Sequence, residues 1–443
     1  MLNWSAPSIP SGEGVDATVV VPGSKSETNR ALVLAALADG PSLITGGLSS
    51  RDADLMRAAL AQLGVDIQDV DGAWRVTPPA AFLVPAAPID CGLAGTVMRF
   101  VPPIAALNGG GTSFVGDPHA SARPMQPLLA ALTQLGVRVD SDAIPFTQDA
   151  SGGLVGRRVE IDSSGSSQFV SALLLAGARF PEGIEVAHVP AGPGASVPSL
   201  PHIEMSIAML REHGVQVETP AENTWRVQPG PIAAVDQPVE PDLTSAAVFL
   251  AVAAVCGGVV RVPGWPAQST QGGAHFIDVV TRMGAQATLD LDETGSRGTM
   301  VVRGDGNLRG IGEVDLHASS ELTPVVAALA ALAEGRTRIR GVAHIRGHET
   351  NRLEALVNEL SAVGADITET ADGLDIHGRG RSVLHAARLR AYADHRLAHV
   401  AAVIGLAVPG IELDDIGCTS KTIADFPGMW DELTGSRAGA GRG

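Results

Sequence analysis

Lysine is almost absent from this chain. Of its 31 basic side chains only Lys25 and Lys421 are lysines, and the other 29 are arginines. A lysine is a compact charge with three rotatable donors, whereas an arginine is a fixed planar fork, so the two lysines mark positions where arginine would not serve. Both lie in short turn-like segments in opposite halves of the sequence. We expect them to hold one small anionic ligand from both halves of the molecule, with codon bias as the alternative.

Cysteines, aromatic residues and net positive charge are scarce as well. The three cysteines, Cys91, Cys256 and Cys418, lack metal-ligand spacing, which predicts no metal site and a reducing cytoplasm. Aromatic residues make up only 3% of the chain, which suits the close-packed layers of an α/β protein. A net charge of −17 argues against nucleic-acid or anionic-membrane partners, because these select basic surfaces.

Long apolar runs are missing too. The longest, such as 246–256, are much shorter than a membrane span. Residues 1–14 have neither the basic start nor the apolar centre of a signal peptide. We therefore expect a cytoplasmic protein with no membrane partner.

A repeated pattern organises the chain. An apolar helical segment that ends in a glycine recurs at Gly64, Gly136, Gly214, Gly284 and Gly364, and such a glycine turns the chain out of a helix. A short strand with alternating polarity accompanies the pattern at 41–45, 111–116, 183–187, 258–262, 335–340 and 410–414. Together these signals predict six α/β units of roughly 70–80 residues each.

A chain of 443 residues is too long for one core, so we expect two domains. Two proline-containing segments, 229–241 and 21–23, are the candidate crossings between them. The first three-unit domain is predicted over 23–239, and the second over 1–22 with 240–434. The Gly/Arg-rich residues 435–443 are predicted to be a disordered tail.

Several segments place polar and basic residues at predicted helix starts. In 23–30 a glycine-serine loop leads into an apolar helix, and Ser26 and Arg30 lie four residues apart, so both can reach one phosphate. The segment is not a P-loop, because Ser24 stands where that motif needs glycine. The serine-rich segment 163–168 also precedes an apolar helix, where helix capping is the alternative to anion binding. Further candidate helix starts with an arginine are 93–99, 116–124, 348–352 and 394–396.

These helix starts contain motifs that occur together in one family. They are Pro-Gly-Ser-Lys-Ser…Asn-Arg (22–30), Ala-Gly-Thr…Arg (94–99), Arg-Pro (123–124), Ser-Ser-Gln-Phe (166–169), Glu-Thr-Asn-Arg (349–352), Asp-His-Arg (394–396) and Thr-Ser-Lys-Thr (419–422). Over roughly 15–433 the chain closely resembles the enolpyruvyl transferase family, and within it the members that act on shikimate-3-phosphate. The resemblance implies an α/β (α+β) protein, a two-domain inside-out α/β barrel of six repeated βαβαββ units, three in each domain.

The resemblance also implies a reaction and its substrates. The carboxyvinyl group of phosphoenolpyruvate would pass to the 5-hydroxyl of shikimate-3-phosphate by addition and elimination, with release of phosphate. No metal or organic cofactor is implied, and we expect a monomer. Such a reaction needs one group to take the hydroxyl proton, another to protonate the methylene carbon, and positive charge to hold the anions.

Residue roles follow from the resemblance position by position. The implied catalytic residues are Glu321, Glu349 and Lys25. The implied shikimate-3-phosphate contacts are Lys25, Ser26, Arg30, Ser166, Ser167, Gln168, Ser199, Glu321 and His348. The implied phosphoenolpyruvate contacts are Lys25, Gly95, Arg123, Gln168, Arg352, Arg396 and Lys421. Whether Glu349 or a lysine delivers the carbon proton stays open.

The chain departs from the family pattern at a few positions. Glu321 stands where many members have Asp, and Leu93 stands where an Asn often precedes Ala-Gly-Thr. His344 and His348 replace an Asn and a Lys, and a neutral histidine can hydrogen-bond but carries charge only part of the time.

Two rival functions remain at this point. A UDP-N-acetylglucosamine enolpyruvyl transferase shares the fold and donor, but it typically has a cysteine in the loop that corresponds to 116–122, and none is present here. A non-catalytic family member would be expected to have lost one of the catalytic residues, and all are retained. In either enzyme, many positive groups in one cleft would repel each other until anions arrive. We therefore expect ligands to close the two domains about hinges at 20–23 and 238–242.

Overall fold

The chain folds into two compact units, each built from residues distant in sequence. The computed structural model describes residues 3–10, 12–192 and 196–435. One unit comprises Gly23–Val239, and the other joins the N-terminal residues up to Pro22 with those from Glu240 onward. Apart from Gly435, the predicted tail lies outside the described residues. No helix in the described ranges has both the length and the hydropathy needed to cross a membrane.

Six small sheets repeat one plan, as the sequence repeat predicts. In the sheets with four strands, the first pair is parallel and the remaining neighbours are antiparallel. The 23–239 unit contains β14 (Gln237–Pro238), β3 (Ser42–Thr45), β5 (Ala73–Thr77) and β4 (Asp66–Val70); β6 (Ile89–Asp90), β7 (Gly111–Val115), β9 (Phe146–Asp149) and β8 (Arg138–Val139); and β10 (Arg158–Ile161), β11 (Ile184–His188), β13 (Thr224–Val227) and β12 (Val217–Ala221).

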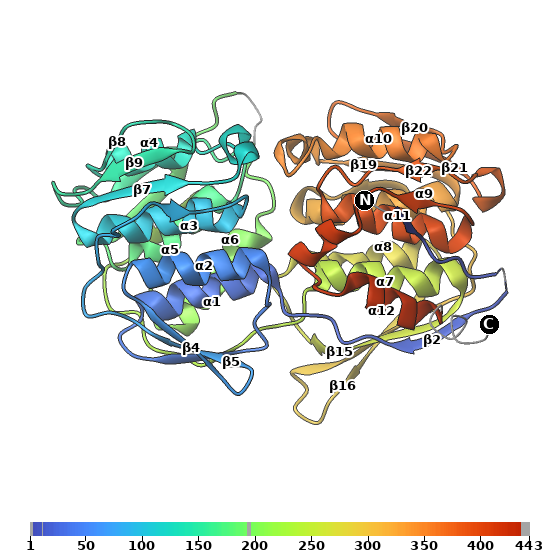
Figure 1. Ribbon diagram of the computed structural model, residues 1–443, viewed down its shortest axis with the longest axis horizontal. Helices are drawn as coiled ribbons and strands as arrows, with labels where there is room; N and C mark the ends of the chain where they lie inside the picture. The colour runs from blue at the N-terminus through green and yellow to red at the C-terminus, as the bar shows by residue number, and fades with distance from the viewer. Residues whose placement is uncertain (1–2, 11, 193–195, 436–443) are drawn as a thin grey trace. The chain divides into compact units, whose positions relative to one another are not determined.

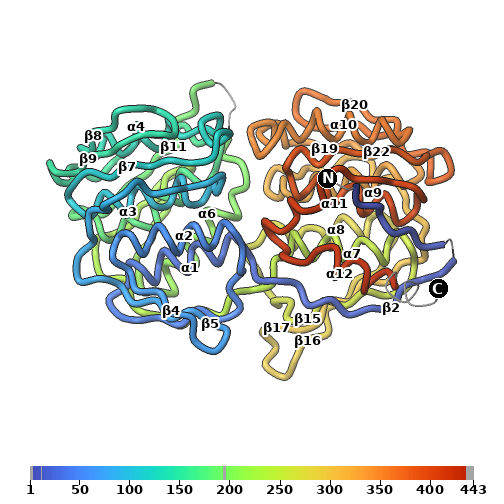
Figure 2. The backbone as a smooth tube through the Cα atoms, in the orientation of Figure 1, coloured from blue at the N-terminus to red at the C-terminus, as the bar shows by residue number. Residues whose placement is uncertain are grey.

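The second unit uses strands from both ends of the chain. Its sheets are β2 (Val15–Thr18), β15 (Gly258–Pro266), β17 (Arg297–Gly304) and β16 (Gln286–Leu291); β18 (Gly312–Asp315), β19 (Glu334–Arg340), β21 (Leu374–Arg379) and β20 (Ile367–Glu369); and β22 (Arg388–Leu389), β23 (Glu412–Leu413) and β1 (Trp4–Ser5). The pairing of β2 with β15 brings together segments more than 200 residues apart, which Figure 2 shows in blue and yellow. The N-terminal residues are therefore an integral part of this unit.

Each unit buries three helices almost completely. They are α1 (Lys25–Leu37), α3 (Gly95–Ala105) and α5 (Gln168–Gly177) in one unit, and α7 (Leu243–Cys256), α9 (Thr323–Leu332) and α11 (His395–Ala407) in the other (Figure 1). Their apolar residues surround the helix on all sides, as a helix packed within a core requires. Each set of three packs together within its own hydrophobic core.

The remaining helices are amphipathic and end as the repeat predicts. They are α2 (Arg51–Gln62), α4 (Gln126–Gln134), α6 (Pro201–Glu212), α8 (Phe276–Arg282), α10 (Arg352–Ala362) and α12 (Phe426–Thr434). The five repeat glycines follow α2, α4, α6, α8 and α10, and each has a positive φ, between 77° and 119°. The helix-ending role of these glycines is confirmed, since only glycine takes this conformation without steric cost. The fold is thus a mixed α/β fold with six sheets; barrel closure and the assignment of a substrate to each domain stay predictions.

Candidate active site

The start of α1 presents Lys25 and Ser26 in the 23–239 unit. Ser24 caps the helix, with its hydroxyl accepting from the Glu27 backbone N–H at 3.4 Å. Lys25 forms an ion pair with Asp52 of α2, with Nζ and Oδ2 3.7 Å apart. The backbone N–H groups of a helix start and the positive end of the helix dipole favour an anion here.

Arg30, one turn further along α1, is used differently from the expectation. Its side chain is almost fully buried, and burial lowers its pKa to about 9. The guanidinium donates to Ser206 Oγ at 2.8 Å, to Ser171 Oγ at 3.2 Å, and to the backbone carbonyls of His202 and Ser26, both at 2.9 Å. Three of its five N–H groups therefore hold α1 against α5 and α6, and a fourth bonds to the backbone carbonyl of Ser26 within α1.

Two arginines gather at the start of α3. Arg123 Nη1 donates to the carbonyl of Leu93 at 2.9 Å, and a Cβ added to Gly95 would lie only 2.9 Å from Arg123 Nη2. Arg99 Nη1 donates to Gln168 Oε1 at 2.7 Å, which turns the amide nitrogen of Gln168 away from it. Arg99 is not among the predicted site residues. Its position in the 93–99 motif, at a predicted helix start, was the sequence signal that could have identified it.

The serine-rich segment ends where α5 begins, in the same unit. The Ser166 hydroxyl accepts from the Gln168 backbone N–H at 3.2 Å, and Ser167 precedes the first residue of the helix. Among the described residues, the buried hydroxyls of Ser163 and Ser164 have no hydrogen-bond partner. Ser199, just before α6, has a left-handed φ of 51°, and such strained residues concentrate at functional sites. This arrangement suits recognition of a polar anion.

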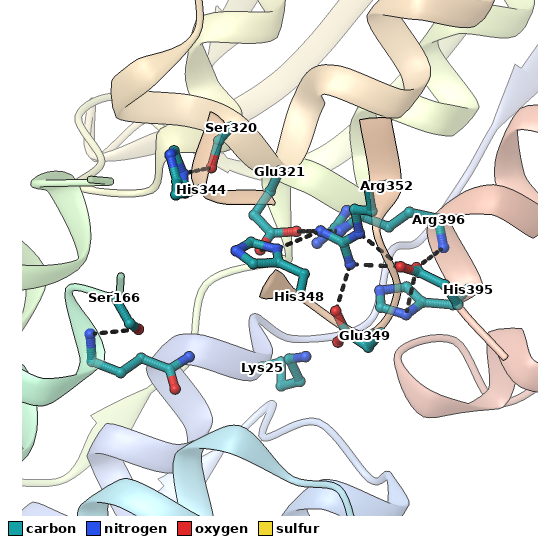
Figure 3. A network of polar contacts seen from close by, with 12 residues as sticks. Lys25, Ser166, Ser320, Glu321, His344, His348, Glu349, Arg352, His395 and Arg396 are labelled. Atoms are coloured by element: carbon teal, nitrogen blue, oxygen red, sulfur yellow. Dashed lines mark hydrogen bonds and ion pairs between the residues drawn. The ribbon is translucent and has the colours of Figure 1, made fainter. Parts of the chain in front are cut away.

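Arg352 is the centre of a second cluster, in the unit that contains α7 to α12. It begins α10, is 1% exposed, and joins three carboxylates (Figure 3). Nε donates to Asp394 Oδ2 at 2.7 Å, Nη1 to Glu321 Oε2 at 2.8 Å, and Nη2 to Glu349 Oε2 at 2.8 Å. Helix α10 begins at Arg352, so His348 lies outside the helix, in the segment that precedes it. Asp394 was present in a predicted motif, but its contact with Arg352 was not foreseen.

Glu321 lies between two arginines. Its Oε2 is 2.5 Å from Arg396 Nε as well as 2.8 Å from Arg352 Nη1. Burial on its own would raise the pKa of Glu321, but the charges of Arg396 and Arg352 outweigh burial and hold that pKa well below its usual value. Glu321 is therefore a carboxylate at neutral pH.

Histidines next to Glu321 are neutral. Burial lowers the pKa of His348 to about 3 and that of His344 to about 4. Arg352 Nη1 lies 2.9 Å from His348 Nδ1, and an arginine only donates, so Nδ1 is the acceptor and the ring proton sits on Nε2. Glu321 Oε1 is 3.5 Å from the same Nδ1, which has no proton to share with it. His344 Nε2 is 2.9 Å from the hydroxyl of Ser320.

Lys421 completes this cluster. It ends a short helical turn, Gly417–Lys421, and its Nζ donates to Glu349 Oε1 at 2.8 Å. Arg352, Arg396 and Lys421 are thus matched by Glu321, Glu349 and Asp394. The expected repulsion among unpaired positive groups is wrong for this unit, because the carboxylates already neutralise them.

The predicted site residues form two clusters. One, within 23–239, contains Lys25, Ser26, Arg30, Gly95, Arg123, Ser166, Ser167, Gln168 and Ser199. The other contains Glu321, His348, Glu349, Arg352, Arg396 and Lys421. Across the described residues no group of three or more His, Cys, Asp or Glu side chains is placed to hold a metal ion.

Comparisons with known proteins agree with this geometry. The family model "EPSP synthase (3-phosphoshikimate 1-carboxyvinyltransferase)" matches residues 9–433. A 3-phosphoshikimate 1-carboxyvinyltransferase of Kocuria rhizophila is 49% identical over 98% of this chain and 97% of its own length. The EPSP synthase structure of Acinetobacter baumannii matches 96% of this chain and 97% of its own with a TM-score of 0.79 at 24% identity. The enolpyruvyl transferase NikO of Streptomyces tendae matches 96% of both chains with a TM-score of 0.71 at 18% identity. The fold is thus that of EPSP synthase, and the chain belongs to the EPSP synthase (3-phosphoshikimate 1-carboxyvinyltransferase) family.

Proposed function

We propose that Glu321, held between Arg352 and Arg396, is the centre of this chain's catalytic chemistry. The chain is a 3-phosphoshikimate 1-carboxyvinyltransferase of the shikimate pathway, which leads to the aromatic amino acids. It transfers the carboxyvinyl group of phosphoenolpyruvate to the 5-hydroxyl of shikimate-3-phosphate and releases phosphate. The observation that carries the proposal is the contact of one half-buried carboxylate with two arginines, 2.5 and 2.8 Å away.

Shikimate-3-phosphate is assigned mainly to the cluster of the 23–239 unit. The first turns of α1 and α5 offer backbone N–H groups, the Lys25 ammonium and serine hydroxyls, which together suit a phosphate and ring hydroxyls. Its contacts are Lys25, Ser26, Ser166, Ser167, Gln168 and Ser199, with Arg30 using its remaining N–H or holding Ser26 in place. From the second unit, Glu321 and the neutral Nε2–H of His348 are assigned to the reacting hydroxyl and its neighbours.

Phosphoenolpyruvate is assigned to the arginines and to Lys421. Arg352 and Arg396 take its carboxylate, because a guanidinium matches a carboxylate with two parallel hydrogen bonds. Arg123, the Gly95 backbone, Lys25, Gln168 and Lys421 take its phosphate and bridging oxygen. Glu321 and Glu349 contact these same basic groups, so the substrate anion has to compete with protein carboxylates.

This competition gives Glu321 its activity as a base. When phosphoenolpyruvate takes Arg352 and Arg396, Glu321 loses the charges that depress its pKa, and burial then raises that pKa toward the working pH. Glu321 accepts the proton of the 5-hydroxyl of shikimate-3-phosphate while the oxygen of that hydroxyl forms a bond to C2 of phosphoenolpyruvate. A proton from the Glu349–Lys421 pair goes to the methylene carbon, which gives a tetrahedral intermediate. A methyl proton then returns to the Glu349–Lys421 pair, and phosphate departs with the proton that Glu321 took up, which restores the double bond and both groups.

The location and assembly of the protein are proposed on less direct grounds. All three cysteines are free thiols, which suits the reducing cytoplasm. The monomeric state is proposed from the resemblance to the family.

A phosphate-release assay tests the function. Phosphoenolpyruvate is supplied with shikimate-3-phosphate, with UDP-N-acetylglucosamine, or alone. We expect rapid release only with shikimate-3-phosphate. Release only with the nucleotide sugar, or equal release in all three mixtures, contradicts the proposal.

A further inference from the structure

Helix α10 is fastened at two points to the turn that precedes α11. It begins with Arg352 and carries Glu359 seven residues later, two turns along the same face. Arg352 Nε donates to Asp394 Oδ2 at 2.7 Å. Glu359 Oε1 accepts from the Tyr392 hydroxyl at 2.7 Å, and its Oε2 accepts from the Arg390 backbone N–H at 2.9 Å. One helix face thus holds both the start and the end of residues 390–394.

The turn itself has an unfavourable backbone conformation. Tyr392 and Ala393 are consecutive non-glycine residues with φ of 55° and 54°, in the left-handed region. Such a conformation persists only where the surroundings enforce it. The Ala391 backbone N–H donates to Asp414 Oδ1 at 2.8 Å, and Glu359 holds the next residue by its side chain. Burial, with the Glu359 carboxylate beside it, raises the pKa of Tyr392 to about 12, so its hydroxyl stays a donor at neutral pH.

Asp394 transmits the geometry of this turn to the basic cluster. It is fully buried, and it binds Arg352 while accepting the Arg396 backbone N–H at 2.9 Å to cap α11. A change in the turn therefore moves the carboxylate that aims Arg352 and the helix start that carries Arg396. Apart from Arg352, the residues that hold the turn, Glu359 and Asp414, do not belong to the predicted site.

We propose that Glu359 and Tyr392 are positioning residues for phosphoenolpyruvate, acting through the left-handed turn and Asp394 on Arg352 and Arg396. The inference rests on the proposed function, because it takes those two arginines as the binding site of the substrate carboxylate. The inference adds a contact outside the site, between Glu359 and Tyr392, that fixes the orientation of the two guanidinium groups. A misplacement of about 1 Å at a reacting centre costs up to roughly a hundredfold in rate.

Ala393→Gly separates positioning from mere support of the fold. Ala393 is exposed, so its methyl group is lost without a buried cavity, and glycine accepts a positive φ without strain. The folded state should keep or gain thermal stability while the turn becomes freer. Asp71→Gly is the matched control, since Asp71 is also exposed, has a φ of 50°, and lies in the β4–β5 hairpin of the other unit.

The experiment measures melting temperature, kcat, KM for phosphoenolpyruvate and calorimetric Kd for shikimate-3-phosphate. The proteins are the wild type, Ala393→Gly, Tyr392→Phe, Glu359→Gln, the Tyr392→Phe/Glu359→Gln double variant and Asp71→Gly. We expect the Ala393→Gly, Tyr392→Phe and Glu359→Gln variants to lose roughly ten- to hundredfold in kcat/KM for phosphoenolpyruvate, with an unchanged Kd for shikimate-3-phosphate. The double variant should lose little more than Glu359→Gln alone, because Tyr392→Phe removes only the hydroxyl that Glu359 binds, whereas Glu359 also accepts the Arg390 N–H.

The outcomes separate the two proposals. An active wild type with normal kcat/KM in Ala393→Gly and Tyr392→Phe overturns the positioning role alone. A fall in activity that merely follows a fall in melting temperature also overturns it. A wild type without activity toward shikimate-3-phosphate overturns the proposed function as well. If Ala393→Gly does not fold, kcat/KM for phosphoenolpyruvate in Tyr392→Phe tests the positioning role instead.

Discussion

Replacing Glu321 with glutamine tests the proposed base. The amide keeps the size of the carboxylate and one acceptor oxygen, so Arg352 Nη1 retains a partner at the observed 2.8 Å. Its negative charge is lost, and with it the ability to accept the proton of the reacting hydroxyl. The fold should tolerate the change, because Asp394 and Glu349 still bind Arg352.

The magnitude follows from the two roles of the carboxylate. A positioned base contributes typically 10²–10⁴ in rate, which corresponds to about 2.7–5.5 kcal/mol of transition-state stabilisation. Binding should change in the other direction. Removing a carboxylate that competes for Arg352 and Arg396 leaves them freer for the substrate anion. We therefore expect kcat to fall by about 10²–10⁴ while KM for phosphoenolpyruvate stays the same or falls.

Steady-state phosphate release with both substrates gives kcat and KM. Glu369→Gln is the matched control, since Glu369 is also paired with an arginine, Arg346, 2.7 Å away but outside the cluster. Wild-type kcat in Glu321→Gln would refute the assignment and move the role to Glu349. A raised KM with unchanged kcat would make Glu321 a binding group only.

Three further predictions concern other residues of the two units. Gly95→Ala adds a methyl group 2.8–2.9 Å from the Arg99 and Arg123 guanidinium groups. In the phosphate-release assay, KM for phosphoenolpyruvate should therefore rise at least tenfold, which corresponds to about 1.4 kcal/mol. An unchanged KM would remove Arg123 from that site. Lys25→Arg and Lys421→Arg should each lower kcat/KM at least tenfold, and normal kinetics in both would leave codon bias as the reason for the two lysines. Burial lowers the pKa of His399 to about 3, whereas an unfolded histidine titrates near 6.5. Between these two pH values the unfolded state binds more protons than the folded state, so the free energy of unfolding decreases as the pH is lowered. His399→Leu should abolish about 2 kcal/mol of the stability lost between pH 7 and pH 5 in denaturant unfolding, and an unchanged loss would assign it to other groups.

The repeat of the fold was predictable because its signals are local. A helix-ending glycine and an alternating strand each depend only on neighbouring residues. The helix ends at Gly64 and Gly364 can therefore be predicted without the tertiary structure. The helix starts at Lys25, Gly95 and Gln168 were marked in the same way, by loops that run into apolar segments.

The partners of the site residues were not predictable, because they come from distant segments. Arg352 and Asp394 are 42 positions apart, and nothing local signals that they form a buried pair. The spacing predicts Arg30 as a phosphate contact, whereas serine hydroxyls and backbone carbonyls occupy four of its five donors. The expected charge repulsion failed for the same reason, since the pairing of Lys421 with Glu349 depends on tertiary structure. Closure of the domains on ligands stays a prediction.

The central claim is that phosphoenolpyruvate frees Glu321 by taking Arg352 and Arg396 from it. The most direct measurement is a pH titration of the Glu321 carboxyl carbon by ¹³C NMR in glutamate-labelled protein, with and without phosphoenolpyruvate. The Glu321→Gln variant assigns the signal. We predict that this carboxyl titrates well below the usual range of a glutamate in the free protein, because Arg396 and Arg352 depress its pKa. With phosphoenolpyruvate bound it should titrate at a clearly higher pH than in the free protein. The same titration with and without the substrate would contradict the account.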